Sequence, residues 1–314
     1  MNQHPERVVV ALGGNALVRQ GDRGTAVEQE ARSLAAMEAL APLLTPERQV
    51  VITYGNGPIV GNILIRQQHA REVIPPMPLD VCGAESQGNI GYLLERALVQ
   101  VLRRHGINRS VATMLSLVEV DPNDPAFHHP TKPIGPFLSE AEAQELSHSV
   151  PVIRDSDRGF RRVVASPLPQ RIIESTALDV LLSAGVTVIT LGGGGVPVAF
   201  DREQRLIGIE AVIDKDLSSG LLACAIGASS LIILTDIDHV YVNFLSPQRQ
   251  AVRRMTVAEA DDHFQRGEFL PGSMAPKVEA AITFLRSGGQ RVLIGLPEAL
   301  PQLLEGTSGT ELIP

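Results

Sequence analysis

The sequence predicts an α/β fold in which helices sandwich an open, mainly parallel β-sheet. Three observations predict it. Apolar runs at Val8–Leu12, Val50–Tyr54 and Val186–Leu191 each lead into a glycine-rich loop, strands alternate with helices along the chain, and 314 residues with 44% hydrophobic content suffice for a large core. Because parallel strands end at a common edge, we expect the three loops to border one ligand site there.

Hydrophobic spacing and end signals define the other elements in chain order. Leu34, Met37 and Leu40 form a helical stripe, Pro58 opens a helix where proline is tolerated, and Leu94 and Leu98 belong to a long apolar helix face. The expected helices are Thr25–Leu44, the segment from Pro58, Gly83–Arg104, Ile172–Ala184, Asp216–Ile226, Val257–Gln265, Pro276–Ser287 and Pro297–Leu304. The further expected strands are Val111–Leu117, Leu231–Thr235 and Arg291–Leu296.

A stretch of different texture interrupts this alternation. Residues 120–169 are rich in Pro, His, Asp and Arg, and the stretch is too long for a plain connection. We interpret it as a lid subdomain inserted within a single domain of residues 1–314, protruding over the carboxyl edge of the sheet.

Composition narrows the class of protein. A net charge of −8 and an aromatic content of 4% without tryptophan argue against a nucleic-acid partner or an anionic membrane surface. Two cysteines, Cys82 and Cys224, make no disulfide framework, which favours a reducing, cytoplasmic location. The apolar segment 177–200 is broken by four glycines and Pro197, so we do not expect it to span a membrane.

The glycine loops are candidate phosphate sites, because glycine lets backbone N–H groups approach an anion closely. No P-loop motif occurs, and the glycine spacing after Tyr54 does not fit a dinucleotide fingerprint. Any one loop is equally well explained as a tight turn, but three together favour ligand binding. The candidate residues are Gly13, Gly14, Asn15, Gly55, Asn56, Gly57, Gly193 and Gly194.

Lysine is scarce: the chain contains only Lys132, Lys215 and Lys277. Lys132 lies in the proline-rich insert, and Lys215 and Lys277 lie at expected helix starts, where a cation is disfavoured by the helix dipole by roughly 0.3–1 kcal/mol. A single exposed lysine needs no explanation, but this placement suggests an anion between them. Asp216 is either the N-cap of its helix or a group that holds the lysines or lies near magnesium.

Other catalytic patterns are weak. The adjacent His128 and His129 point apart and lack zinc spacing, so we assign no metal ligands. The segment Gly83–Gly88 lacks the nucleophile elbow of a serine hydrolase.

At this point the chain resembles the carbamate kinases, within the larger amino acid kinase fold. The resemblance runs along nearly the whole chain. It is carried by the motifs at 11–17, 53–58, 78–83, 86–88, 130–137, 161–164, 192–197, 210–216, 234–236 and 272–277. Two of them look specific to the carbamate branch: Pro-Thr-Lys-Pro-Ile-Gly-Pro-Phe at 130–137 and Ala-Val-Ile-Asp-Lys-Asp at 211–216.

The resemblance implies a reaction: reversible phosphoryl transfer between carbamoyl phosphate and ADP, giving carbamate and ATP with Mg²⁺. Ala11 stands where acetylglutamate kinase and its relatives have a lysine, so Lys132 from the insert would supply that charge. Lys215 and Lys277 would face the phosphates, and Asp216 would organise them. The first two glycine loops would form the carbamate and phosphoryl pocket. The implied nucleotide-binding residues are Asp214, Lys215, Asp236, Met274 and Lys277.

The resemblance also implies a homodimer and a role in arginine or purine breakdown. One departure is Ala275, where the family has glycine; a positive φ there would strain the loop before Lys277. Two alternatives stay open. One is a kinase of another small acid in the same fold, such as acetylglutamate, and the other is a nucleotide-binding sensor without catalysis.

Overall fold

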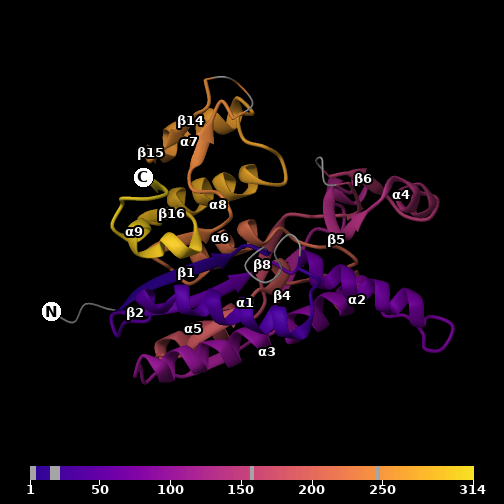
Figure 1. Ribbon diagram of the computed structural model, residues 1–314, viewed down its shortest axis with the longest axis horizontal. Helices are drawn as coiled ribbons and strands as arrows, with labels where there is room; N and C mark the ends of the chain where they lie inside the picture. The colour runs from indigo at the N-terminus through magenta and orange to yellow at the C-terminus, as the bar shows by residue number, and fades with distance from the viewer. Residues whose placement is uncertain (1–4, 15–21, 156–158, 245, 247) are drawn as a thin grey trace.

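The computed structural model describes residues 5–14, 22–155, 159–244, 246 and 248–314 (Figure 1). Asn15, predicted to belong to the phosphate pocket, lies outside these ranges. The helices are α1 (Ala26–Ala39), α2 (Gly57–Ala70), α3 (Leu79–Arg104), α4 (Glu140–Ser147), α5 (Ser175–Ser183), α6 (Lys215–Ala225), α7 (Val257–Gln265), α8 (Met274–Arg286) and α9 (Leu300–Leu304). No helix of the described ranges is long and apolar enough to cross a membrane.

The strands form one large sheet and three small ones. They are β1 (Glu6–Leu12), β2 (Arg48–Tyr54), β3 (Val111–Thr113), β4 (Leu117–Val120), β5 (Lys132–Leu138), β6 (Val152–Arg154), β7 (Phe160–Val164), β8 (Pro169–Ile172), β9 (Thr187–Thr190), β10 (Val196–Phe200), β11 (Leu206–Gly208), β12 (Ser230–Leu234), β13 (Val240–Val242), β14 (Gln250–Val252), β15 (Arg254–Thr256), β16 (Arg291–Gly295) and β17 (Thr310–Ile313). The eight-stranded sheet has the order β15-β17-β16-β12-β1-β2-β9-β3. Its described neighbours are parallel except β16 and β17, which confirms the predicted open, mainly parallel sheet.

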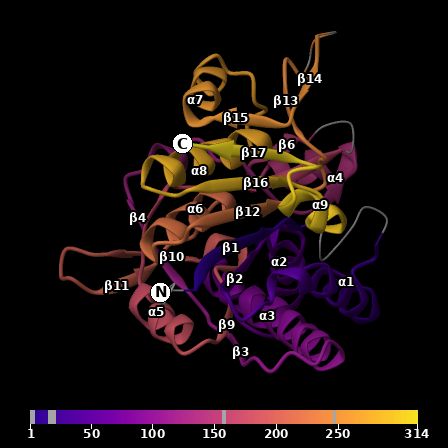
Figure 2. The ribbon, with the colours of Figure 1, turned by 90° about the vertical axis from the view of Figure 1, so that its left-hand side faces the viewer.

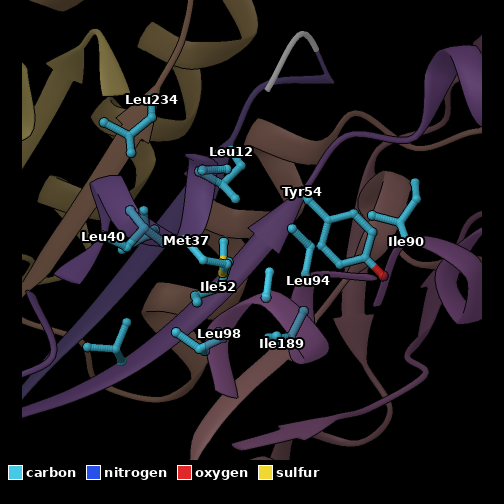
Figure 3. Close-up of a cluster of buried hydrophobic side chains, with 14 of the residues drawn as sticks. Leu12, Met37, Leu40, Ile52, Tyr54, Ile90, Leu94, Leu98, Ile189 and Leu234 are labelled. Atoms are coloured by element: carbon cyan, nitrogen blue, oxygen red, sulfur yellow. The ribbon is translucent and has the colours of Figure 1, made fainter. Parts of the chain in front are cut away.

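Helices cover both faces of this sheet, because successive strand residues point to opposite sides. In β1, Val8, Val10 and Leu12 pack into a core with α1, α2 and α3. Val9 and Ala11 pack into a second core with α5, α6 and α8. The first core is drawn in Figure 3, where Leu12 and Ile52 lie among side chains of α1 and α3, and Figure 2 shows α1 and α3 together on that side of β1 and β2. The continuous apolar runs of β1 and β2 follow from burial on both faces.

The stretch predicted as an insert folds into its own small unit. Strands β5, β7 and β6 form an antiparallel three-stranded sheet, and α4 follows β5 with Ser139 and Glu142 in a capping box. In Figure 1 this unit projects beside α2, away from the large sheet. Its role as a lid over the carboxyl edge stays a prediction.

Two predicted elements are wrong in detail. Residues Val111–Leu117 do not form one strand: β3 lies at an edge of the large sheet, and β4 belongs to the second sheet with β10 and β8. The reason is Gln87, whose amide accepts from the N–H of Ser116 at 3.0 Å and donates to its carbonyl at 3.1 Å. Ser116 is thereby held to α3, and the chain turns there. Ile172 ends β8, so the next helix begins only at Ser175.

Candidate functional site

The first two glycine loops meet at the carboxyl edge of the sheet. The N–H of Gly13 donates to Leu234 O at 2.9 Å, and the N–H of Gly55 donates to Leu12 O at 3.1 Å. A Cβ on Gly55 would lie 3.0 Å from Gly14 N and 3.3 Å from Lys215 Cδ. The loops after β1 and β2 therefore touch one another and the start of α6, with little room for a side chain between them.

The third loop lies beneath this surface. Gly193 and Gly194 have φ of +64° and +89° and are buried. A Cβ on Gly193 would meet the Asn56 side chain at 2.1 Å, and one on Gly194 would lie 2.6 Å from Ile213 O. Asn56 is 5% exposed and donates to Ser86 Oγ at 2.6 Å. These contacts make the third loop a packing surface for Asn56 and the segment before α6; its direct contact with phosphate stays a prediction.

All three lysines of the chain converge at the N-terminus of α6. Lys132 Nζ lies 2.5 Å from Asp214 Oδ2, although Lys132 comes from the insert. Lys215 Nζ and Lys277 Nζ lie 2.5 and 3.2 Å from the two oxygens of Asp216. The anion expected between the lysines thus includes the protein's own Asp216 carboxylate.

The two aspartates have different local roles. Asp214 is the N-cap of α6: its Oδ1 accepts from the N–H of Asp216 at 2.8 Å while Oδ2 contacts Lys132. The N-cap interpretation of Asp216 is therefore wrong, and its carboxylate instead joins Lys215 to Lys277. Capping by Asp214 stabilises the first turn of α6, which positions the carboxylates of Asp214 and Asp216 that contact the three lysines.

The electrostatics of the cluster follow from burial and pairing. Burial acts to raise the pKa of the Asp216 carboxyl, but Lys215 and Lys277 outweigh it and hold that pKa well below its usual range. Burial lowers the pKa of Lys215 against the attraction of Asp216. Burial opposes the charged form of Lys277 too, yet Asp216 and Asp214 raise its pKa above the ordinary value. Asp216 is consequently ionised at neutral pH.

Residues predicted for the nucleotide lie along the same edge. Asp236 follows β12 and is exposed, and its charge contributes to the raised pKa of Lys277. Lys277 Nζ also donates to Ser273 O at 3.0 Å, next to the buried Met274. Ala275 lies in the first turn of α8 and has no positive φ; Gly272 carries one, +69°, before the helix. The strain expected at Ala275 is absent.

A pocket beside Met274 was not predicted. It is small, about 20 Å³, and is lined mainly by apolar and aromatic side chains. Its lining residues are Ile237, His239, Tyr241, Phe244, Glu268, Phe269, Leu270, Ser273 and Met274. Because Lys277 bonds to the Ser273 carbonyl, the pocket adjoins the lysine cluster. The pocket is too small to enclose a nucleotide base. Its apolar and aromatic lining next to ammonium groups instead offers a surface for a flat ring that carries phosphates.

In the described part of the chain, no group of three or more His, Cys, Asp or Glu side chains is placed to hold a metal ion. Asp216 has both oxygens engaged with lysines, and Asp214 is engaged with Lys132 and the α6 backbone. In this arrangement both carboxylates neutralise ammonium groups.

Comparisons with known proteins agree with this geometry. Residues 6–295 match the model of the amino acid kinase family. The chain is 42% identical to a carbamate kinase of Trichomonas vaginalis over 98% of this chain and 99% of that one. It is 44% identical to a carbamate kinase-like protein of Escherichia coli, with the same coverage.

Solved structures give the same result. The chain superposes on carbamate kinase from Giardia lamblia bound to citric acid with a TM-score of 0.93 and 36% identity, covering 98% of both chains. The same enzyme bound to AMP-PNP gives a TM-score of 0.89. The chain belongs to the amino acid kinase family, in its carbamate kinase branch.

Proposed function

We propose that this protein catalyses reversible phosphoryl transfer between carbamoyl phosphate and ADP, giving carbamate and ATP. The observation that carries the proposal is the convergence of Lys132, Lys215 and Lys277 around Asp214 and Asp216, beside the bare backbone of the loops after β1 and β2. Relatives that cover almost the whole chain are carbamate kinases, which supports the same acceptor here.

The chemistry needs alignment and positive charge. A β-phosphate oxygen of ADP attacks the phosphorus of carbamoyl phosphate, the bond from phosphorus to the carbamate oxygen breaks, and carbamate leaves as an anion. No proton has to move in this step, so no general base is required. Lys132 and Lys277 would stabilise the equatorial oxygens, and amides of Gly13, Gly14 and Gly55 would fix the phosphate position.

The nucleotide is expected to enter along α8. We assign its base to the apolar side chains that line the pocket around Met274 and its phosphates to Lys277 and Lys215, because the Lys277–Ser273 contact brings the two groups side by side. A related structure bound to AMP-PNP supports a nucleotide on this branch of the family. Asp236 at the end of β12 lies close enough to act on the charge of Lys277.

Magnesium is expected to arrive with the nucleotide. The oxygens of Asp214 and Asp216 already serve lysines and backbone N–H groups, so phosphate oxygens would supply most ligands of the ion. Bound there, magnesium would neutralise phosphate charge during transfer.

A coupled assay for ATP formed from ADP and carbamoyl phosphate tests the proposal. Lys132→Ala and Lys277→Ala should each lower kcat about 100- to 1,000-fold, the loss typical for one preorganised charge donor. Arg71→Ala, which removes an exposed cation paired with Glu72, is the control and should leave kcat unchanged. No ATP from the unmodified protein, or full turnover in either lysine variant, contradicts the assignment.

The same assay with an acceptor panel separates the alternatives. ATP hydrolysed only with acetylglutamate or a similar acid would identify another kinase of this fold. Tight ADP binding without ATP formation would identify a sensor; Ala275, the sequence feature that suggested one, lies in unstrained helix.

We further infer a homodimer that uses the β3 edge of the large sheet. β3 is the outermost strand at its end of that sheet, and α3 packs beside it with Gly91 against Thr113. Tyr92 and Val99 on α3 are exposed and lie seven residues apart, on one helix face. Sedimentation should give a dimer for the protein and a monomer for Tyr92→Asp; a monomeric parent protein contradicts the inference.

We place the protein in the cytoplasm and in ATP production from carbamoyl phosphate released by arginine breakdown. Cys82 and Cys224 are both unpaired thiols, which suits a reducing compartment. Loss of ATP yield from arginine in cells lacking the protein would support this role, and an unchanged yield would contradict it.

A further inference from the structure

The insert that carries Lys132 rests on α2 through an unusually close backbone contact. A Cβ added to Gly61, in the interior of α2, would lie 1.9 Å from Gly135 Cα and 2.2 Å from Gly135 N. Both of these are backbone atoms, which cannot rotate away. Any side chain at position 61 therefore forces α2 and β5 apart.

The insert is the partner that would move. Ile59, Val60 and Ile63 of α2 are buried in the main core, so the helix is fixed by packing on both sides of Gly61. Gly135 has φ +75° and follows Ile134, the residue through which β5 reaches that core. Displacement at Gly135 would thus pivot β5 near Ile134.

Lys132 lies on the other side of this pivot, three residues before Gly135 on the same strand. Its Nζ meets Asp214 at the N-terminus of α6. The backbone at Gly135 is also held by Arg161 of β7, whose Nε donates to Gly135 O at 3.1 Å. One strand therefore joins the backbone contact on α2 to an ammonium group in the candidate site.

We propose that the Gly61–Gly135 contact is the seat that positions Lys132 for phosphoryl transfer, and that Gly61 is a positioning residue of the reaction. This inference rests on the proposed function. In this proposal the insert docks on α2 at one defined point. When Gly135 lies against Gly61, Lys132 lies beside Asp214 and the expected position of the phosphates. Gly61 itself touches none of the reacting groups.

Gly61→Ala and Gly88→Ala are a matched pair of helix substitutions. A Cβ on Gly88, an exposed position inside α3, meets nothing within 4 Å. Replacing glycine by alanine in an unobstructed helix raises stability, here by about 1–2 °C in melting temperature. Gly88→Ala should therefore melt higher with unchanged kcat, whereas Gly61→Ala should lower kcat about 10- to 100-fold, the effect of a misplacement near 1 Å.

Two further readouts identify the route of the effect. The KM for ADP should stay unchanged in Gly61→Ala, because none of the residues that line the pocket proposed for the base belongs to α2 or to the insert. In a Lys132→Ala background, Gly61→Ala should change kcat by less than about twofold, since a positioning residue cannot act through a missing group. An equal loss in both backgrounds overturns the proposal.

Hydrogen exchange tests the seat without any turnover. Exchange over Lys132–Leu138 and Phe160–Val164 should rise in Gly61→Ala and not in Gly88→Ala. Unchanged exchange, or kcat within about twofold of the parent, overturns the seat. If the unmodified protein forms no ATP, the proposed function fails, and exchange alone decides the docking contact. If Gly61→Ala does not fold, Gly135→Ala replaces it. The added Cβ would lie 3.6 Å from Gly61 Cα, but the φ of +75° at this position is strained for alanine, so the backbone should shift. We therefore expect kcat to fall, and an unchanged kcat overturns the proposal.

Discussion

Replacing Asp216 by asparagine removes the negative charge that joins Lys215 to Lys277 while keeping the side-chain shape. Asp216 is 3% exposed, and its two oxygens lie 2.5 and 3.2 Å from the two ammonium groups. Leaving buried charges without their partner costs about 3–5 kcal/mol. With an unfolding entropy of about 2.1 cal/mol/K per residue, a chain of 314 residues loses about 1.5 °C per kcal/mol, so Asp216→Asn should lower the melting temperature by about 5–8 °C.

The control is Asp262→Asn, which breaks an exposed pair with Arg266 at 3.0 Å and should shift melting by less than about 2 °C, as expected for a surface ion pair. Addition of ADP provides a second measurement. Because phosphate can replace the missing carboxylate between the lysines, ADP should raise the melting temperature of Asp216→Asn more than that of the parent. Melting within 1 °C of the parent, by scanning calorimetry at about pH 7, would refute the assigned role of Asp216.

Three further predictions follow from the same contacts. The pKa of Asp216 is lowered in the folded protein, so the stability that its carboxylate contributes is complete above the pKa of the unfolded chain, about 4, and is lost as the pH falls below that value. The difference in stability between the parent and Asp216→Asn should therefore narrow below about pH 4, as urea titrations from pH 7 to 3 would measure. Gly193→Ala should destabilise by about 2 kcal/mol or more, because φ is +64° and its Cβ would lie 2.1 Å from Asn56, whereas Gly227→Ala, with φ +60° and nothing within 4 Å of its Cβ, should lose only about 1 kcal/mol. Met274→Ala should raise the KM for ADP about fivefold, by loss of apolar contact in the base pocket, with kcat preserved; an unchanged KM in steady-state assays would exclude the pocket as the base site.

The lysine cluster was predictable because scarcity made each lysine informative. With Lys132, Lys215 and Lys277 as the whole set, their positions in loops and at helix starts indicated one site, and the structure brings all three together. The large sheet was equally predictable, since β1, β2, β9 and β12 are apolar runs buried on both faces. The local pattern of apolar residues was enough to predict a strand wherever consecutive residues are buried.

The division of labour between Asp214 and Asp216 was not predictable. Both precede or begin the same helix, and an N-cap preference applies to either. Only the distant Lys132 and Lys277, brought in by the insert and by α8, decide which carboxylate caps and which bridges. The break between β3 and β4 has the same origin, because Gln87 acts from another element.

The pocket around Met274 was not predicted, although the sequence carries a signal for it. Four of the chain's eleven aromatic residues, counting Phe and Tyr, fall within 241–269. They are Tyr241, Phe244, Phe264 and Phe269. Three of these line the pocket, where short strands without glycine motifs gave no periodic pattern. In a chain so poor in aromatics, such a concentration indicates a binding surface better than strand periodicity does.

The burial of Ala11 is consistent with the proposal that the insert supplies a catalytic lysine, Lys132. Ala11 is fully buried on the face of β1 that packs with α6 and α8. The aliphatic part of a lysine at this position would have to pass through that core for its ammonium group to reach the carboxyl edge of the sheet. Lys132 instead approaches from β5, outside the sheet, and meets the N-terminus of α6 directly. Under the proposed function, the charge around the transferring phosphoryl group would be complete only when the insert is docked on α2. Substrate alignment and docking of the insert would then be one event, and for this reason we expect a glycine contact on α2, remote from the chemistry, to control kcat.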